Sequence, residues 1–256
     1  MQMIPWLLLA PCLIAPAPKV SPPVVEIRTA NCELSEEERT LITATLQAEA
    51  ALLEDLFGPS SESPSLRVQL HGSFQAFQAF RDSETKAKSR TGFYSPALGL
   101  AVVMKQEGYL GVVAHELLHA QLRQRFQSPP TWLNEGLAEY VESSTVQSGQ
   151  LKAIPQAVKL KRVLATLHHG GFPLKPLVSW EHSQWSQENE AKGHPASTWS
   201  WALVTFLLEG PQPRERIRLI LTKILQGKET YKVMEEHYPG GFHVLERDLG
   251  AWFRLH

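Results

Sequence analysis

His115-Glu116-Leu117-Leu118-His119 is followed by a second motif, Trp132-Leu133-Asn134-Glu135-Gly136, whose glutamate lies sixteen residues after the second histidine. On an α-helix, residues four apart lie on one face about 6 Å apart along the axis, so the two imidazoles can converge on one metal ion. Glu116 lies about 100° round the helix, where its carboxylate reaches a water on the metal rather than the metal itself. These are the positions that a catalytic zinc site and its general base require.

The residues around the first motif are apolar, which predicts a buried helix. Gly111 to Ala114 precede the motif, and leucines and an alanine lie within and after it. Buried histidines can also be core residues bonded to backbone carbonyls, and this alternative corresponds to a metal-free structural domain. Two imidazoles and a carboxylate on one apolar helix are costly without a cation, however, so the sequence favours a metal site.

A second helix is predicted at residues 132–142, after Pro129-Pro130 and with Thr131 as its N-cap. Two helices joined by a short loop pack antiparallel, which brings Glu135 opposite the histidine pair and leaves one coordination position open. Glu139 lies one turn further along. We expect it to accept the second N–H of a ligating histidine, although an exposed charge on the helix surface is the alternative.

These motifs resemble those of the gluzincin clan of metallopeptidases, which includes thermolysin and the zinc aminopeptidases, and they are most similar to small bacterial domains described as peptidase MA-like. The resemblance implies that one Zn²⁺ ion is held by His115, His119 and Glu135. It also implies that Glu116 is the base and that Glu139 orients a histidine. The similarity extends over roughly residues 66–210.

The fold that the resemblance implies is α+β, with a small mixed sheet and zinc-binding helices in a thermolysin-like catalytic core, followed by a helical C-terminal lobe. We expect one metallopeptidase domain at residues 21–256, with the sheet and zinc helices at 24–145 and the helical lobe at 150–256. From residue 151 onward the apolar pattern predicts only helices. They are expected at 160–167, 198–208, 214–225 and 242–253.

Local signals define the elements before the zinc motif. Residues 24–28 and 66–70 are expected to form strands. Ser35 and Glu38 form a capping box before an amphipathic helix that ends at Gly58-Pro59. Ser73 is expected to cap a short helix whose three phenylalanines face the core.

The apolar run Leu100, Ala101, Val102, Val103 and Met104 precedes the zinc helix. We expect it to form the sheet edge nearest the metal. An extended peptide substrate could then add itself as another strand through main-chain hydrogen bonds.

A donor for the developing oxyanion is less clearly defined. Related domains often carry tyrosines a few residues before the Ser-Trp-Ala-Leu stretch, where this chain has Ala196 and Ser197. His194 is the candidate donor because a histidine in a loop that leads into a helix can polarise a carbonyl oxygen. Tyr94 and Tyr109 are the alternatives.

The first twenty residues are predicted to be an export signal rather than part of the fold. The segment is apolar and ends in Ala15-Pro16-Ala17, which is similar to a small-residue cleavage signal. It is too short and too rich in proline to span a membrane. We expect a periplasmic or extracellular protein, with lipid anchoring at Cys12 as the less favoured alternative.

Composition restricts the possible partners. The chain of 256 residues has a formal net charge of −1 and no basic stripe, which argues against nucleic acid as a partner. After loss of Cys12, Cys32 would be the only thiol, so no internal disulfide would form. The expected partner is a peptide or protein substrate, and the sequence does not define the oligomeric state.

The expected activity is zinc-dependent hydrolysis of peptide bonds. Cleavage within chains is favoured, because the segment 99–108 has no Gly-rich motif like the one that holds the substrate amino terminus in the aminopeptidase branch. A catalytically silent, peptidase-like binding module is the alternative. The missing clan-type tyrosine permits it, whereas the retained Glu116 argues against it.

Overall fold

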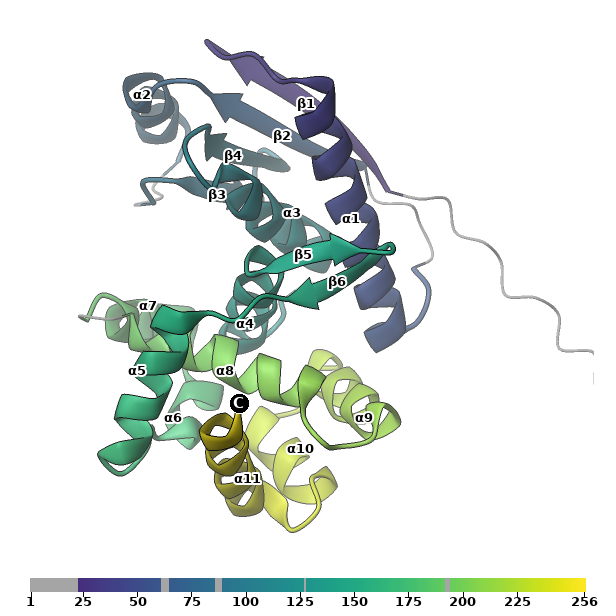
Figure 1. Cartoon of the computed structure of the whole chain (residues 1–256), viewed down its shortest axis with the longest axis vertical. Helices are drawn as coiled ribbons and strands as arrows, with labels where there is room; N and C mark the ends of the chain where they lie inside the picture. The colour runs from purple at the N-terminus through teal and green to yellow at the C-terminus, as the bar shows by residue number, and fades with distance from the viewer. Residues whose placement is uncertain (1–22, 61–64, 86–88, 127, 192–193) are drawn as a thin grey trace, which may run out of the picture.

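The computed structural model describes residues 23–60, 65–85, 89–126, 128–191 and 194–256. The predicted export signal at residues 1–20, including Cys12, lies outside these residues. The described chain has an α+β fold, with a small mixed sheet at one end of the molecule and a group of helices at the other (Figure 1). The predicted fold class is confirmed at this level.

The sheet has four strands in the order β1-β2-β4-β3. They are β1 (Val24–Ala30), β2 (Ser65–His71), β3 (Gly92–Ser95) and β4 (Leu100–Met104). β1 and β4 both pair with β2 in parallel, whereas β3 is antiparallel to β4, with Phe93 opposite Val102. β3 is therefore an edge strand and β4 is an inner strand.

The prediction that Leu100, Ala101, Val102 and Val103 form the sheet edge is wrong. Ala101 and Val103 face one apolar cluster, and Leu100 and Val102 face another on the opposite side of the sheet. A strand that is buried on both faces has an unbroken apolar run. The run therefore reports burial on both faces, whereas the inner position comes from the pairing of β4 with β2 and β3. The edge next to the candidate metal site is β3.

Helices cover both faces of the sheet. α1 (Glu36–Phe57) and α3 (Tyr109–Arg125) pack on one face, and α2 (Phe74–Glu84) packs on the other with the buried ring of Phe77. The predicted capping box of Ser35 and Glu38 starts α1, and Ser73 caps α2. α3, which carries the histidine motif, is thereby fixed against β2, β3 and β4.

α4 (Thr131–Glu142) follows α3 and begins after Pro130, so Thr131 is its first residue and not its N-cap as predicted. A hairpin comes next, made of β5 (Ser144–Gln147) and β6 (Gln150–Ala153). Its two turn residues, Ser148 and Gly149, both have positive φ, which suits a tight hairpin turn. The prediction of an all-helical chain from residue 151 is therefore wrong for β6.

The rest of the chain consists of helices. They are α5 (Ala157–His168), α6 (Leu174–Ser179), α7 (His182–Asn189), α8 (Pro195–Glu209), α9 (Arg214–Leu225), α10 (Thr230–His237) and α11 (Gly241–Leu255). The four predicted helices correspond to α5, α8, α9 and α11, and the other three are short. None of the described helices is both long enough and apolar enough to cross a membrane.

α8 is the central helix of this group and packs along α4. The two helices approach closely at Gly136, where an added Cβ would lie 2.5 Å from the carbonyl oxygen of Ser200 and 2.6 Å from Cγ2 of Val204. Only glycine fits this crossing. Glu135, the residue before it, is thus held on a helix that is fixed to α8.

Candidate metal centre

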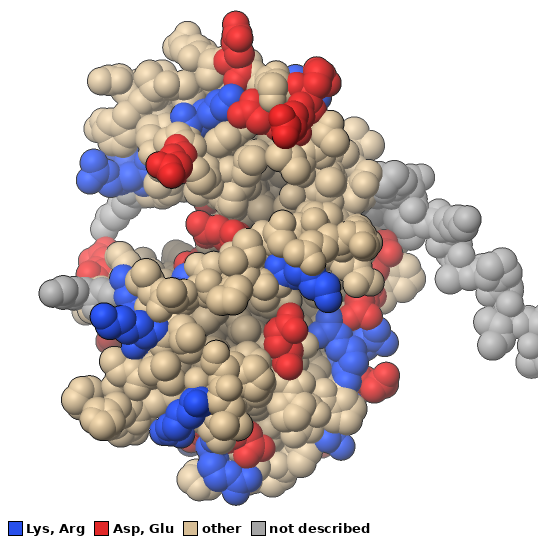
Figure 2. Space-filling view, viewed as in Figure 1, with Lys and Arg blue, Asp and Glu red and all other residues tan. Residues whose placement is uncertain are grey.

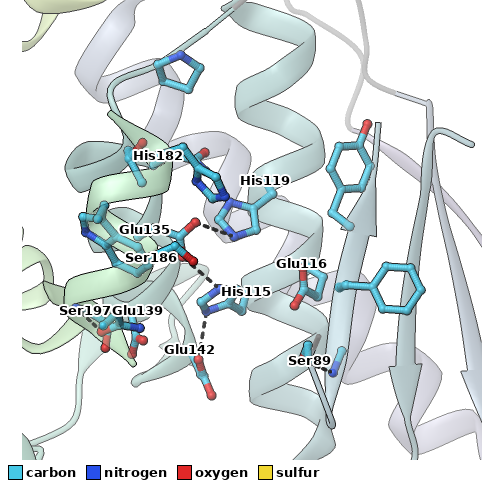
Figure 3. Close-up of a pocket in the computed structure, with 18 of the residues that line it drawn as sticks. Ser89, His115, Glu116, His119, Glu135, Glu139, Glu142, His182, Ser186 and Ser197 are labelled. Carbon is cyan, nitrogen blue, oxygen red and sulfur yellow. Dashed lines mark hydrogen bonds and ion pairs between the residues drawn. The ribbon is translucent and has the colours of Figure 1, made fainter. Parts of the chain in front are cut away.

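The two histidines of α3 and the glutamate of α4 point toward one another (Figure 3). One ligand atom from each of His115, His119 and Glu135 lies within 4.8 Å of the others. The Nε2 atoms of His115 and His119 are each 3.8 Å from an oxygen of Glu135. The structure therefore brings together the three residues that the sequence spacing selects.

This donor set fits a zinc ion. Two imidazole nitrogens and one carboxylate oxygen form a known set for catalytic zinc, in which a fourth position stays open. Ligands about 2.1 Å from a tetrahedral ion are about 3.4 Å apart. The two contacts of 3.8 Å would close by a few tenths of an ångström, and the widest pair of donor atoms, which lies within 4.8 Å, would close further. All three side chains are largely buried, where such a group is costly without a cation.

His115 is oriented by Glu142. Its Nδ1 atom lies 2.8 Å from Oε2 of that glutamate, which leaves Nε2 facing Glu135. Burial alone would lower the pKa of His115, but this hydrogen bond and the charges of Glu116, Glu135 and Glu142 raise it to about 10. In return, although burial opposes it, the bond to His115 lowers the pKa of Glu142.

Glu139, the expected partner of a ligating histidine, has a different contact. Its carboxylate forms an ion pair with Nζ of Lys159 on α5. Glu142 is seven residues after Glu135 and so lies on the same helix face two turns away. Gly111 leaves room for Glu142, since an added Cβ there would lie 3.3 Å from its Cγ. The spacing of seven is compatible with this role, but Glu139 at a spacing of four lies on nearly the same face, so spacing alone does not choose between the two glutamates.

His119 lies in a different electrostatic environment from His115. Burial is the main influence on its ring and lowers the pKa, although the charge of Glu135 opposes this. A lowered pKa favours the neutral imidazole, which is the form that binds metals. His119 is therefore ready to ligate at neutral pH, whereas His115 must first lose a proton.

Glu116 is buried beside the candidate ligands, between α3 and β3 (Figure 3). Burial raises its pKa to about 7; the charges of Glu135 and Glu142 also raise it, while His115 and a hydrogen bond from the backbone N–H of Tyr94 lower it. A carboxylate with a pKa near neutrality is suited to both accept and return a proton.

A cleft of about 1100 Å³ opens onto these residues. The edge strand β3 forms one wall, α3 and α4 form the floor, and the opposite wall comes from α7 and the start of α8. That opposite wall contains His182, Trp185, Ser186, Asn189, His194 and Ser197. Figure 2 shows a hollow between the sheet part and the helical part, with acidic side chains at its inner wall.

His194, the predicted oxyanion donor, lines this cleft just before α8 in the left-handed backbone conformation, with φ of 48°. Its Nδ1 lies 2.9 Å from the carbonyl oxygen of Asn189. A carbonyl only accepts, so Nδ1 carries the hydrogen and Nε2 of the neutral ring is an acceptor. His194 can donate to an oxyanion only as the imidazolium.

The alternative donors differ in position. Tyr94 lines the cleft, but Tyr109 does not, because its hydroxyl donates to Glu38 at 2.8 Å on the other side of α3. Tyr109 is therefore excluded. Sequence reasoning did not identify His182, which begins α7 and faces the cleft (Figure 3). No local motif marks it, because it enters the wall only through the packing of α7 on α8 and α4.

The site thus combines three convergent donor atoms, a buried carboxylate beside them and a cleft that opens onto both. No protein-family model matches the chain, and no curated protein matches it.

Proposed function

We propose that this chain is a zinc-dependent peptidase of the gluzincin type that cleaves bonds within peptide chains. The observation that carries the proposal is the convergence of His115, His119 and Glu135, with Glu116 buried next to them and facing the same cleft. A metal-ligand group alone supports only metal binding. The adjacent carboxylate, with its pKa near 7, adds the acid–base chemistry that hydrolysis requires.

In the proposed mechanism, His115, His119 and Glu135 hold one zinc ion. When bound, zinc lowers the pKa of a water molecule and polarises a carbonyl group. Glu116 takes the proton from the attacking water and then returns it to the nitrogen of the leaving amine. Glu142 holds the ring of His115 in the orientation that this ligand set requires.

The edge strand β3 supports a peptide as the substrate. Among the described strands β3 pairs with β4 alone, and its residues Gly92 to Tyr94 line the cleft together with the flanking Thr91 and Pro96. An extended peptide that adds to this edge gains main-chain hydrogen bonds, which are independent of sequence. The arrangement of sheet, two ligand helices and helical lobe supports a thermolysin-like core as part of the same proposal.

The test is hydrolysis of casein by the zinc-loaded protein and by Glu116→Gln. We expect the wild type to be inhibited by phenanthroline and the variant to lose a factor of 10² to 10⁴ in rate, at the scale of general base catalysis. Elemental analysis should find one zinc per chain in both proteins. Glu215→Gln, at an exposed position of α9, is the control. Full activity of Glu116→Gln would exclude this base.

A catalytically silent binding module is the second candidate. The observation that favours it is the hydrogen bond that makes Nε2 of neutral His194 an acceptor, so the expected oxyanion donor is present only in charged form. Zinc and peptide binding without cleavage at any pH would support this candidate. A zinc-free wild-type protein would instead support a structural domain.

A further inference from the structure

We propose that Arg123 makes the cleft select substrates with an acidic side chain on the N-terminal side of the cleaved bond. This inference rests on the proposed peptidase function and adds a substrate class to it. It follows from the position of Arg123, the charges in the cleft and the direction of β3.

Arg123 continues the row of ligands along α3. It is four residues after His119 and eight after His115, so it lies on the same helix face about 6 Å beyond His119. It lines the same cleft and is exposed to solvent there. A substrate bound over the metal site and extended along α3 therefore passes this guanidinium.

Arg123 is also distinctive in charge. Of the described residues that line the cleft, it is the only lysine or arginine, whereas four glutamates line the cleft, namely Glu116, Glu135, Glu139 and Glu142. Tyr94 also lines the cleft, and the positive charges of Arg123 and Arg67 both oppose the rise that burial causes in the pKa of that tyrosine, so Arg123 lies near Tyr94. The cleft thus has one basic end.

The direction in which β3 runs determines which end of a bound peptide lies next to Arg123. Gly92, at the start of β3, lies next to Val112 and Glu116, and Tyr94 lies further along toward Arg123. β3 therefore runs toward the basic end. Antiparallel pairing is the more stable kind, so a peptide on this edge runs the opposite way and places its N-terminal residues beside Arg123.

The chemistry of the guanidinium then defines the preference. A guanidinium carries five N–H donors in a planar fork, so donors remain for a substrate carboxylate beside the interaction that Arg123 already has within the protein. Two of these donors can bind a carboxylate through parallel hydrogen bonds. Because the site is open to water, we expect a preference of about fivefold for glutamate over glutamine, at the upper end of exposed ion pairs. Salt should weaken the preference, since exposed charges are screened.

The first experiment maps the bonds that are cleaved in casein by mass spectrometry and then uses matched synthetic peptides around one of these bonds. Each pair of peptides carries Glu or Gln at one position before the bond. We expect a higher kcat/KM for Glu at one such position, loss of the preference in Arg123→Gln and a preference for Lys in Arg123→Glu. Arg162→Gln, an exposed change on α5 outside the cleft, should behave as wild type.

The second experiment measures binding of the same peptides to zinc-loaded Glu116→Gln by fluorescence anisotropy, which needs no turnover. If nothing is cleaved but the acidic peptides bind more tightly through Arg123, the inference holds and the catalytic proposal fails. If peptides are cleaved without a preference for the acidic side chain, or with a preference that Arg123→Gln leaves intact, the inference about Arg123 fails while the proposed peptidase function stands. A preference located only after the cleaved bond would also overturn it.

Discussion

Nδ1 of His115 lies 2.8 Å from Oε2 of Glu142, two helical turns beyond the glutamate that faces the other ring nitrogen. One imidazole is therefore held between two carboxylates of the same helix. One carboxylate is a candidate metal ligand, and the other fixes the ring and its protonation. Several expected outcomes depend on this contact.

Glu142→Gln should weaken zinc binding by about tenfold to a hundredfold, because the carboxylate partner of a ligating histidine fixes its orientation and raises its basicity. Competition with a chromophoric chelator measures the affinity. Glu139→Gln is the matched control, since it breaks only the ion pair with Lys159. If Glu139→Gln lost more zinc affinity than Glu142→Gln, Glu139 rather than Glu142 would be the residue that orients the histidine.

Zinc binding should release about one proton at pH 8. The pKa of His115 is raised to about 10, so this ring is protonated in the metal-free protein and must lose its proton to ligate. Below pH 10 protons compete with the metal, so the apparent zinc affinity should rise from pH 7 to pH 9. Calorimetry in buffers with different ionisation enthalpies counts the protons.

The proton count should fall in Glu142→Gln, because the hydrogen bond to Glu142 is the first cause that raises the pKa of His115. An affinity that does not change with pH in the wild type would contradict this account of His115.

Zinc should stabilise the folded chain, because the three ligands converge only after folding. At a thousandfold excess over Kd, mass action adds about 4 kcal/mol to the free energy of unfolding. For a chain of this size, that corresponds to a rise in Tm on the order of 10 °C. Differential scanning fluorimetry with zinc and then EDTA measures the shift. The Tm of Glu135→Ala should rise far less on addition of zinc. An equal rise would mean that the ion binds elsewhere.

Gly136→Ala should destabilise the protein by about 1–3 kcal/mol, the usual cost of overpacking, since the new methyl group would meet the backbone of α8. Gly250→Ala in α11 is the matched control. There the nearest atoms to an added Cβ are 3.4 Å away, and alanine should add about 0.5–1 kcal/mol through its helix propensity. Urea denaturation measures both variants. Equal stability of the two would mean that α4 and α8 can separate at no cost.

The parts of the fold that the sequence predicted well are those that depend on local signals. The capping box of Ser35 and Glu38, the cap at Ser73 and the long apolar helices involve residues a few positions apart. The place of β4 depends instead on which strand pairs beyond it. Its apolar run was consistent with any strand that is buried on both faces, and only the pairing of β3 beyond it makes it an inner strand.

The same difference between local signals and contacts of distant residues applies to the candidate site. His115 and His119 share a helix, and a short connection constrains where Glu135 can lie, so spacing alone selects them. Glu139 and Glu142 lie on nearly the same face of α4, and their partners depend on Lys159 in α5 and on the space left by Gly111. Sequence periodicity does not contain that information.

The close crossing at Gly136 has a mechanical consequence. Glu135 belongs to a helix that packs closely on α8 as well as on α3, whereas the two histidines belong to a helix that also packs on the sheet. A displacement of the helical part relative to the sheet part would change the distances between Glu135 and the two histidines. A bound ion, which fixes these distances, would oppose such a displacement. A bound ion would thereby join the sheet part and the helical part at the floor of the cleft.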